Sequence, residues 1–111
     1  MIIKNLHSWK TTPKEAAALQ SRLAGQVRPV PIGKKVRLVA GLDCAFSRDK
    51  KRIGAALVVL TFPDLEVIET VHATGPVSFP YVPGLLSFRE APVCLAAAEK
   101  LNNRPDVFLV D

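Results

Sequence analysis

Residues 36–46 read Val-Arg-Leu-Val-Ala-Gly-Leu-Asp-Cys-Ala-Phe and predict the first strand of a sheet. Side chains alternate between the two faces of a strand. Leu38, Leu42 and Phe46 therefore share one apolar face. The other face carries small side chains and one carboxylate, Asp43, near the end of the strand. Aspartate is a poor strand former, and turn chemistry at a strand end is its ordinary structural explanation.

Two further strands are predicted directly after this one. Residues 53–61 are almost wholly apolar, and residues 65–73 alternate between apolar and polar side chains. The turn Phe62-Pro63-Asp64 joins them. Because the links are short, the three strands are expected to form an antiparallel meander.

Two helices are predicted, over residues 12–25 and 87–101. Thr12 can cap the first helix, and Pro13 suits its first turn. The second helix is rich in alanine and leucine, and the run Asn102-Asn103-Arg104-Pro105 breaks it.

Residues 106–111 predict a fourth strand, with the run Val107–Val110 buried on both faces. A strand reached through a crossover helix can run parallel to the first strand. Parallel strands end at the same edge of a sheet. Asp43 and Asp111 are therefore expected to be neighbours.

Composition limits the class of protein. The chain has 111 residues, enough for at most one small domain, and its hydrophobic fraction of 49% excludes a disordered chain. No apolar run reaches the ~18 residues that span a bilayer. The first residues lack a signal-peptide core. We therefore expect no membrane association and a cytoplasmic location.

The net charge of +5 favours anionic partners, although only weakly. The basic cluster from Arg48 to Arg52 is most simply a solvated hairpin turn, and a phosphate contact is the less favoured alternative.

The remaining reactive side chains favour ordinary structural roles. Cys44 and Cys94 lie in apolar runs without metal-binding spacing, which predicts two small buried thiols and no disulfide. His7 and His72 each stand alone and are not expected to bind a metal. Trp9 is most simply a packing anchor.

Three carboxylates converge in the predicted topology: Asp43, Glu90 at the start of the second helix, and Asp111. Such a cluster needs a compensating cation, and Mg²⁺ prefers oxygen ligands. Each has an alternative explanation. Glu90 lies three residues after Ser87, the spacing of a helix capping box, and Asp111 fits a solvated chain end. From spacing alone, the metal site is the minority interpretation.

The segment from Phe79 to Glu90 predicts a stiff loop before the second helix. Pro80 and Pro83 flank Tyr81-Val82 and fix the backbone. A rigid loop that displays an aromatic ring suits the separation of stacked bases. The alternative is a tyrosine whose ring packs on the core and whose hydroxyl faces water.

The run Pro80–Glu90 closely resembles the signature of endonuclease V, a family of DNA repair nucleases. The resemblance extends from Leu6 to the end of the chain. Further matches are Val39–Asp43 with Phe46, and Arg104–Asp106 leading to Val110-Asp111.

This resemblance implies a ribonuclease H-like α/β fold, in which an antiparallel three-stranded meander is joined by a parallel strand after a crossover helix. It implies Mg²⁺-dependent hydrolysis of a phosphodiester 3′ to a deaminated base, chiefly hypoxanthine (inosine). Mn²⁺ is the alternative ion, and RNA the alternative to DNA.

The resemblance also implies roles for individual residues. Asp43 and Asp111 match the metal-binding aspartates, and Glu90 matches the third catalytic acid. The remaining matches are the strand-separating wedge Pro80, Tyr81, Val82 and Pro83, and two residues near the extruded base, Gly84 and Leu86.

Members of this family continue after the last aspartate with a second half of similar size. Residues 1–111 are therefore expected to be the N-terminal part of one nuclease domain, truncated after the fourth strand. We expect weak Mg²⁺ affinity, low or absent turnover, and self-association through an exposed edge and an apolar face. The alternatives are a nucleic-acid-binding fragment that does not cut, and an inert, self-associating half-domain.

Overall fold

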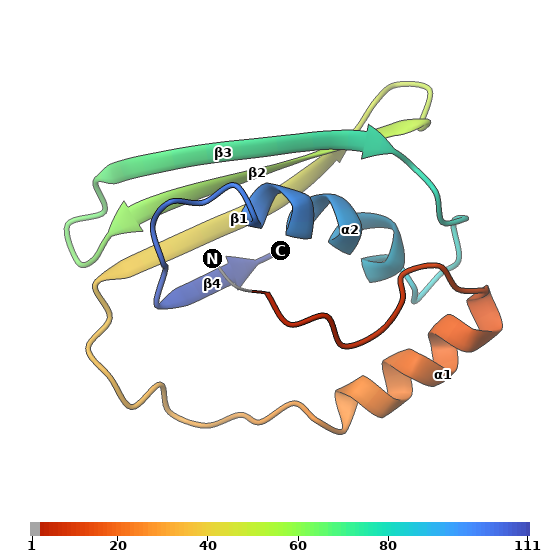
Figure 1. Ribbon diagram of the computed structural model, residues 1–111, viewed down its shortest axis with the longest axis horizontal. Coiled ribbons are helices and arrows are strands. Elements are labelled where there is room, and N and C mark those ends of the chain that lie inside the picture. The colour runs from red at the N-terminus through yellow and green to blue at the C-terminus, as the bar shows by residue number, and fades with distance from the viewer. Residues whose placement is uncertain (1–2) are drawn as a thin grey trace.

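The computed structural model describes residues 3–111, so the first two residues of the predicted domain lie outside the described part. Two helices and four strands follow one another along the chain (Figure 1). The elements are α1 (Pro13–Ala24), β1 (Leu38–Phe46), β2 (Arg52–Thr61), β3 (Val67–Pro76), α2 (Ser87–Ala98) and β4 (Val107–Val110). No helix among the described residues is both long enough and apolar enough to span a membrane.

The four strands form one mixed sheet in the order β3-β2-β1-β4. β1 pairs antiparallel with β2, and β2 pairs antiparallel with β3. β4 returns through α2 and pairs parallel with β1, in a register that sets Val39 opposite Val107 and Leu42 opposite Val110. The predicted meander and parallel fourth strand are both confirmed.

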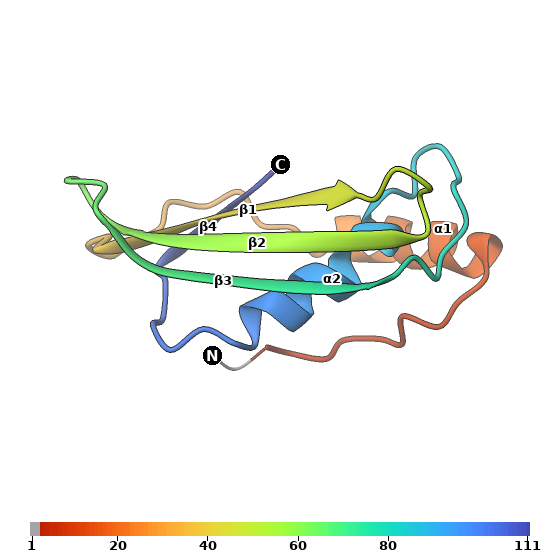
Figure 2. The same cartoon turned by 90° about the horizontal axis from the view of Figure 1, so that it is seen from above.

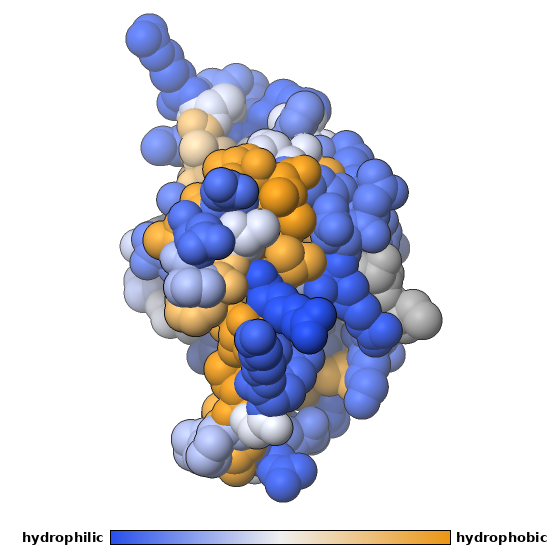
Figure 3. All heavy atoms as spheres, turned by 90° about the vertical axis from the view of Figure 1, so that its left-hand side faces the viewer, coloured by the Kyte–Doolittle hydropathy of each residue, from blue (hydrophilic) through white to orange (hydrophobic). Residues whose placement is uncertain are grey.

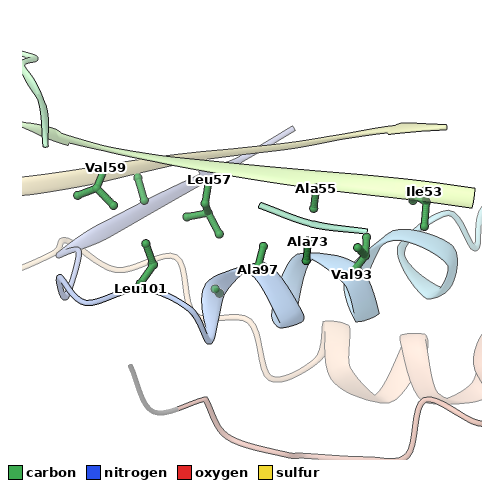
Figure 4. Packing of buried hydrophobic residues seen from close by; sticks show 10 residues of the cluster. Ile53, Ala55, Leu57, Val59, Ala73, Val93, Ala97 and Leu101 are labelled. Carbon is green, nitrogen blue, oxygen red and sulfur yellow. The ribbon is translucent and has the colours of Figure 1, made fainter. Parts of the chain in front are cut away.

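α2 covers one face of the sheet and forms the main core with it (Figures 2 and 4). Leu57 and Val59 of β2 are fully buried, and Val93 and Ala97 of α2 pack against the same face. Complete burial of a leucine or valine side chain contributes roughly 1.5–3 kcal/mol. The predicted apolar face of β1 points the same way, since Leu38, Ala40, Leu42, Cys44 and Phe46 all belong to this core.

A second, smaller core joins α1 to the loop before α2. Phe79, Leu85 and Phe88 are buried there with Ala16 of α1. Trp9 packs against it, with its ring centroid 5.7 Å from that of Phe88. The predicted role of Trp9 as a packing anchor is confirmed. The ring of His7 lies 4.4 Å from that of Trp9.

The entrance to β4 is tied to the beginning of β1 by Asp106. Its Oδ2 accepts hydrogen bonds from the backbone N–H groups of Arg37 (2.9 Å) and Leu38 (3.1 Å), and its Oδ1 lies 3.1 Å from Lys34 Nζ. These contacts lower the pKa of Asp106 to about 2, with the Arg37 and Leu38 bonds as the largest causes. Asp106 also donates its backbone N–H to Leu38 O. The register of the parallel pair is therefore set where β4 begins.

The prediction that Val107–Val110 is buried on both faces is wrong. Leu109 is 64% and Val110 67% exposed. β4 is an edge strand, and in the described part of the chain the sheet face opposite α2 carries no helix (Figure 2). At the end of the sheet that holds the β2–β3 turn, Phe62 and Leu65 are also more than half exposed, and hydrophobic side chains gather in that view (Figure 3).

Candidate functional site

The register of the sheet places Asp43 beside Asp111. Leu42 of β1 pairs with Val110 of β4, and each aspartate is the next residue along its own strand. The Asp43 side chain is exposed, and its Oδ1 accepts a hydrogen bond of 2.8 Å from the Cys44 N–H. This bond fixes one carboxylate oxygen and leaves the other available.

Glu90 approaches the two aspartates from α2. A cleft of about 260 Å³ between α2 and the strand ends is lined by all three carboxylates. Burial raises the pKa of Glu90, the charges of Asp43 and Asp111 raise it further, and Arg89 offsets part of the shift. The structure thus brings the three predicted acidic residues to one cleft.

The capping-box explanation of Glu90 is wrong. The residue at the N-cap of α2 is Leu86, with helical backbone angles, and no side chain caps this end. Ser87 is already the first helical residue, so it cannot play the N-cap role of that motif. The Glu90 carboxylate is therefore not explained by helix capping.

The donor set at this cleft suits a hard divalent cation. Three carboxylates supply oxygen ligands, and a cation between them would relieve the repulsion that raises the pKa of Glu90. The arrangement is open, however. Within residues 3–111, no three histidine, cysteine, aspartate or glutamate side chains are close enough to hold one ion together.

The two cysteines meet at the same cleft. Their Sγ atoms are 3.1 Å apart, both thiols are free, and both are half-buried instead of fully buried as predicted. Burial, the hydrogen bond to Cys94 and the nearby charges together raise the pKa of Cys44 to about 12, with burial as the largest cause.

The predicted wedge loop projects into solvent. Tyr81 is 71% exposed, so its ring does not pack on the core as the alternative explanation required. Phe79 and Leu85 on either side are buried and anchor the loop. Gly84 has a φ of +86°, which favours glycine, and its carbonyl accepts a 3.0 Å hydrogen bond from Gln20 Nε2 of α1.

Arg89 holds this loop to the sheet, a role that sequence reasoning missed. Its Nε donates to Phe79 O (3.2 Å), and its guanidinium carbon lies 4.9 Å from the Phe46 ring centroid and 5.7 Å from that of Tyr81. The sequence does contain a signal for this role. Arg89 lies in the first turn of the helix that follows an aromatic-tipped loop, and cations stack on aromatic faces.

The fold and the site together define a class. A mixed sheet covered by a crossover helix, with carboxylates meeting where two parallel strands end, is an α/β unit of the ribonuclease H-like type, and solved structures similar to it share that fold. This confirms the predicted fold class.

The chain belongs to the endonuclease V family, whose family model, Endonuclease V, matches residues 21–111. Over 109 residues it is 45% identical to the endonuclease V of Dehalococcoides mccartyi, covering 98% of this chain and 49% of that protein. The chain spans about half the length of the curated relatives that it matches.

Two solved structures show the same similarity in three dimensions. The Bacillus subtilis endonuclease V superposes with a TM-score of 0.89 at 33% identity, covering 100% of this chain and 49% of that one. The Ciona intestinalis endonuclease V, solved with a 23mer DNA containing an inosine followed by a ribo-adenosine, gives 0.72 at 27% identity, covering 88% and 44%.

Proposed function

We propose that this chain carries the acidic and strand-separating residues of a DNA repair endonuclease, which hydrolyses a phosphodiester 3′ to a deaminated base with Mg²⁺. The observation that carries the proposal is the strand register that seats Asp43 beside Asp111, opposite Glu90, at one cleft. Membership of the endonuclease V family supports the reaction class. The substrate follows from the inosine-containing DNA bound by the Ciona relative.

Asp43 and Asp111 would hold the ion, and Glu90 is the third acidic group beside it. What Mg²⁺ supplies when bound is polarisation of a phosphoryl oxygen and a hydrolytic water of lowered pKa. Mn²⁺ takes the same oxygen donors. The chain's own contribution is to align the carboxylates, through β1, β4 and α2, around the linkage to be cut.

The loop would open the duplex beside that linkage. Tyr81 stands at the tip between two prolines, while Val82 packs on the second core and holds the loop in place. Gly84 and Leu86 follow and would flank the extruded base. Unstacking a base costs a few kcal/mol, and less at a mismatch-like lesion. A preformed wedge therefore favours damaged positions, in DNA first and in RNA as the alternative strand.

A labelled duplex with one inosine, incubated with and without MgCl₂, tests the proposal. We expect a slow nick that requires Mg²⁺, because the ligand set is open, and its rate should fall by at least ~100-fold in Asp43→Ala. Asp64→Ala, in the β2–β3 turn, is the matched control and should keep the rate. Equal nicking by wild type and Asp43→Ala would reject the site.

A second candidate is nucleic-acid binding without cleavage. It is favoured by the net charge of +5 and by the absence, in residues 3–111, of a closed set of three ligands. Binding of the inosine duplex with no Mg²⁺-dependent product would support it over the first. For either activity we propose a location in the cytoplasm, together with the nucleic-acid substrate.

A further inference from the structure

The turn between β1 and β2, residues 47–51, has a fixed conformation. Ser47 Oγ donates to Asp49 Oδ1 (2.7 Å), and the Lys51 N–H donates to the same oxygen (3.0 Å). The Ser47 N–H donates to Arg52 O at 2.9 Å, and the Lys50 N–H to Ser47 O at 3.0 Å. The predicted hairpin turn is confirmed, and the Asp49 carboxylate is engaged by the turn itself.

The turn and the first residue of β2 carry four exposed cations, and within residues 3–111 none of them forms an ion pair; with the carboxylate of Asp49 in the same turn, the net charge there is +3 (four cations minus one anion). Within residues 3–111, the ion pair formed by side chains is Lys34–Asp106, at the opposite end of β1. The turn therefore presents an unpaired positive charge on a rigid support. The four residues, which we name the basic turn, are Arg48, Lys50, Lys51 and Arg52.

The basic turn adjoins the wedge loop. Both lie at the end of the sheet where α2 begins (Figure 1), and the Val77 N–H donates to Lys51 O at 2.8 Å. A row of alternating cations and rings links the two. Lys50 Nζ lies 5.9 Å from the Phe46 ring, and Arg89 lies between the rings of Phe46 and Tyr81.

The spacing fits a nucleic-acid strand that enters the acidic cleft. Ser47, the first residue after β1, comes four residues after Asp43, which is ~13 Å at the rise of an extended strand. A duplex places a phosphate about every 3.4 Å of axis on each strand. A duplex whose axis follows β1 would thus meet the basic turn about four base pairs from the linkage at the cleft.

We propose that the basic turn is a phosphate-contacting arm, which binds the backbone of a nucleic-acid duplex about four base pairs from the scissile linkage. The inference rests on the proposed function. A nucleic acid fits better than an acidic protein, because the row of cations ends at Tyr81, whose exposed ring can stack on a base. Phosphate contacts fix the register of the duplex and carry no sequence information.

The test is binding of the full chain to a fluorescent inosine duplex, in EDTA, over a series of KCl concentrations. The logarithm of the binding constant falls linearly with log [KCl], and each lost phosphate contact makes this negative slope shallower by about 0.9. We expect Lys50→Gln/Lys51→Gln to make the slope shallower by about 2 and to weaken binding equally on undamaged DNA. Lys35→Gln/Arg37→Gln, at the opposite end of β1, removes the same charge and should leave the slope unchanged.

The outcomes separate this inference from the proposed function. Equal slopes for wild type and the turn variant, with both binding, overturn the inference alone. No duplex binding by wild type overturns both. Arg48→Gln/Arg52→Gln repeats the test should the lysine variant misfold, because within residues 3–111 neither arginine side chain makes a hydrogen bond or ion pair. Tyr81→Ala should lose the preference for inosine and keep the wild-type slope.

Discussion

At the scale of single residues, the Cys44 thiol gives a pH-dependent prediction. Its pKa of about 12, against 9.0 for the unfolded thiol, makes the thiolate about a thousandfold scarcer in the folded chain at pH 8. Alkylation by iodoacetamide should therefore be at least ~10-fold slower in native protein than in guanidinium-unfolded protein. Cys94→Ala removes a contact that raises the pKa and should speed the reaction at Cys44. Equal rates in folded and unfolded chains would contradict this.

The raised pKa of Cys44 also determines how its contribution to the free energy of unfolding changes with pH. Folding favours the neutral thiol, so the contribution is fully present below about pH 9 and is lost as the pH rises towards 12.

The adjacency of Asp43 and Asp111 was predictable, because strand alternation and a crossover connection fix it. The contacts of Arg89 and of Cys94 were not, since they depend on how α2 is rotated on the sheet, which no strand pattern specifies.

At the scale of elements, α1 depends on its N-terminal cap. Thr12 Oγ1 accepts from the Glu15 N–H (3.2 Å) and donates to Glu15 Oε1 (2.8 Å). Thr12→Ala should cost about 1 kcal/mol and speed amide exchange in α1 about fivefold, whereas Thr12→Ser should be near neutral. Exchange in β2 is the internal reference. Unchanged exchange in α1 of the alanine variant would show that packing alone holds the helix.

Element boundaries were predicted to within a few residues, and the exceptions have local causes. α2 ends at Ala98 instead of residue 101, and β3 runs from Val67 to Pro76 instead of 65–73. The turn before β3 is longer than the Phe-Pro-Asp signal indicated, with Leu65 at a φ of +59°. The capping-box interpretation of Glu90 failed because the pattern does not show whether Ser87 lies before or inside the helix.

At the scale of the whole molecule, the uncovered sheet face and the outer edge of β4 predict self-association. An unpaired edge offers backbone donors and acceptors to another strand, and exposed apolar side chains favour contact. We expect a second copy of this chain as the partner. Sedimentation velocity should show a concentration-dependent increase in mass, reduced by Leu109→Lys on β4, with Ser21→Lys, an exposed position of α1, as control. A monomer at all concentrations would contradict the prediction.

The predicted burial of β4 shows what a sequence pattern can and cannot specify here. A run of apolar residues indicates a strand that is suited to cover on both faces. The apolar run does not show which helix or strand packs on each face, and among the described residues no element covers Leu109. The antiparallel order of the first three strands, by contrast, follows from the short connections within the chain, whereas the ribonuclease H-like fold class was implied by the resemblance to endonuclease V.

The hydrogen bonds of Asp106 have a consequence for the acidic cleft, although they lie at the other end of the short strand. Asp106 fixes where β4 starts against β1, and the main chain carries that offset forward to Asp111. The distance between two groups of the proposed centre is thus controlled remotely. A substitution at Asp106, far from any reacting atom, can therefore change the separation of the Asp43 and Asp111 carboxylates while the fold is kept. The activity of the proposed centre can thus be altered without a change in any of its own residues.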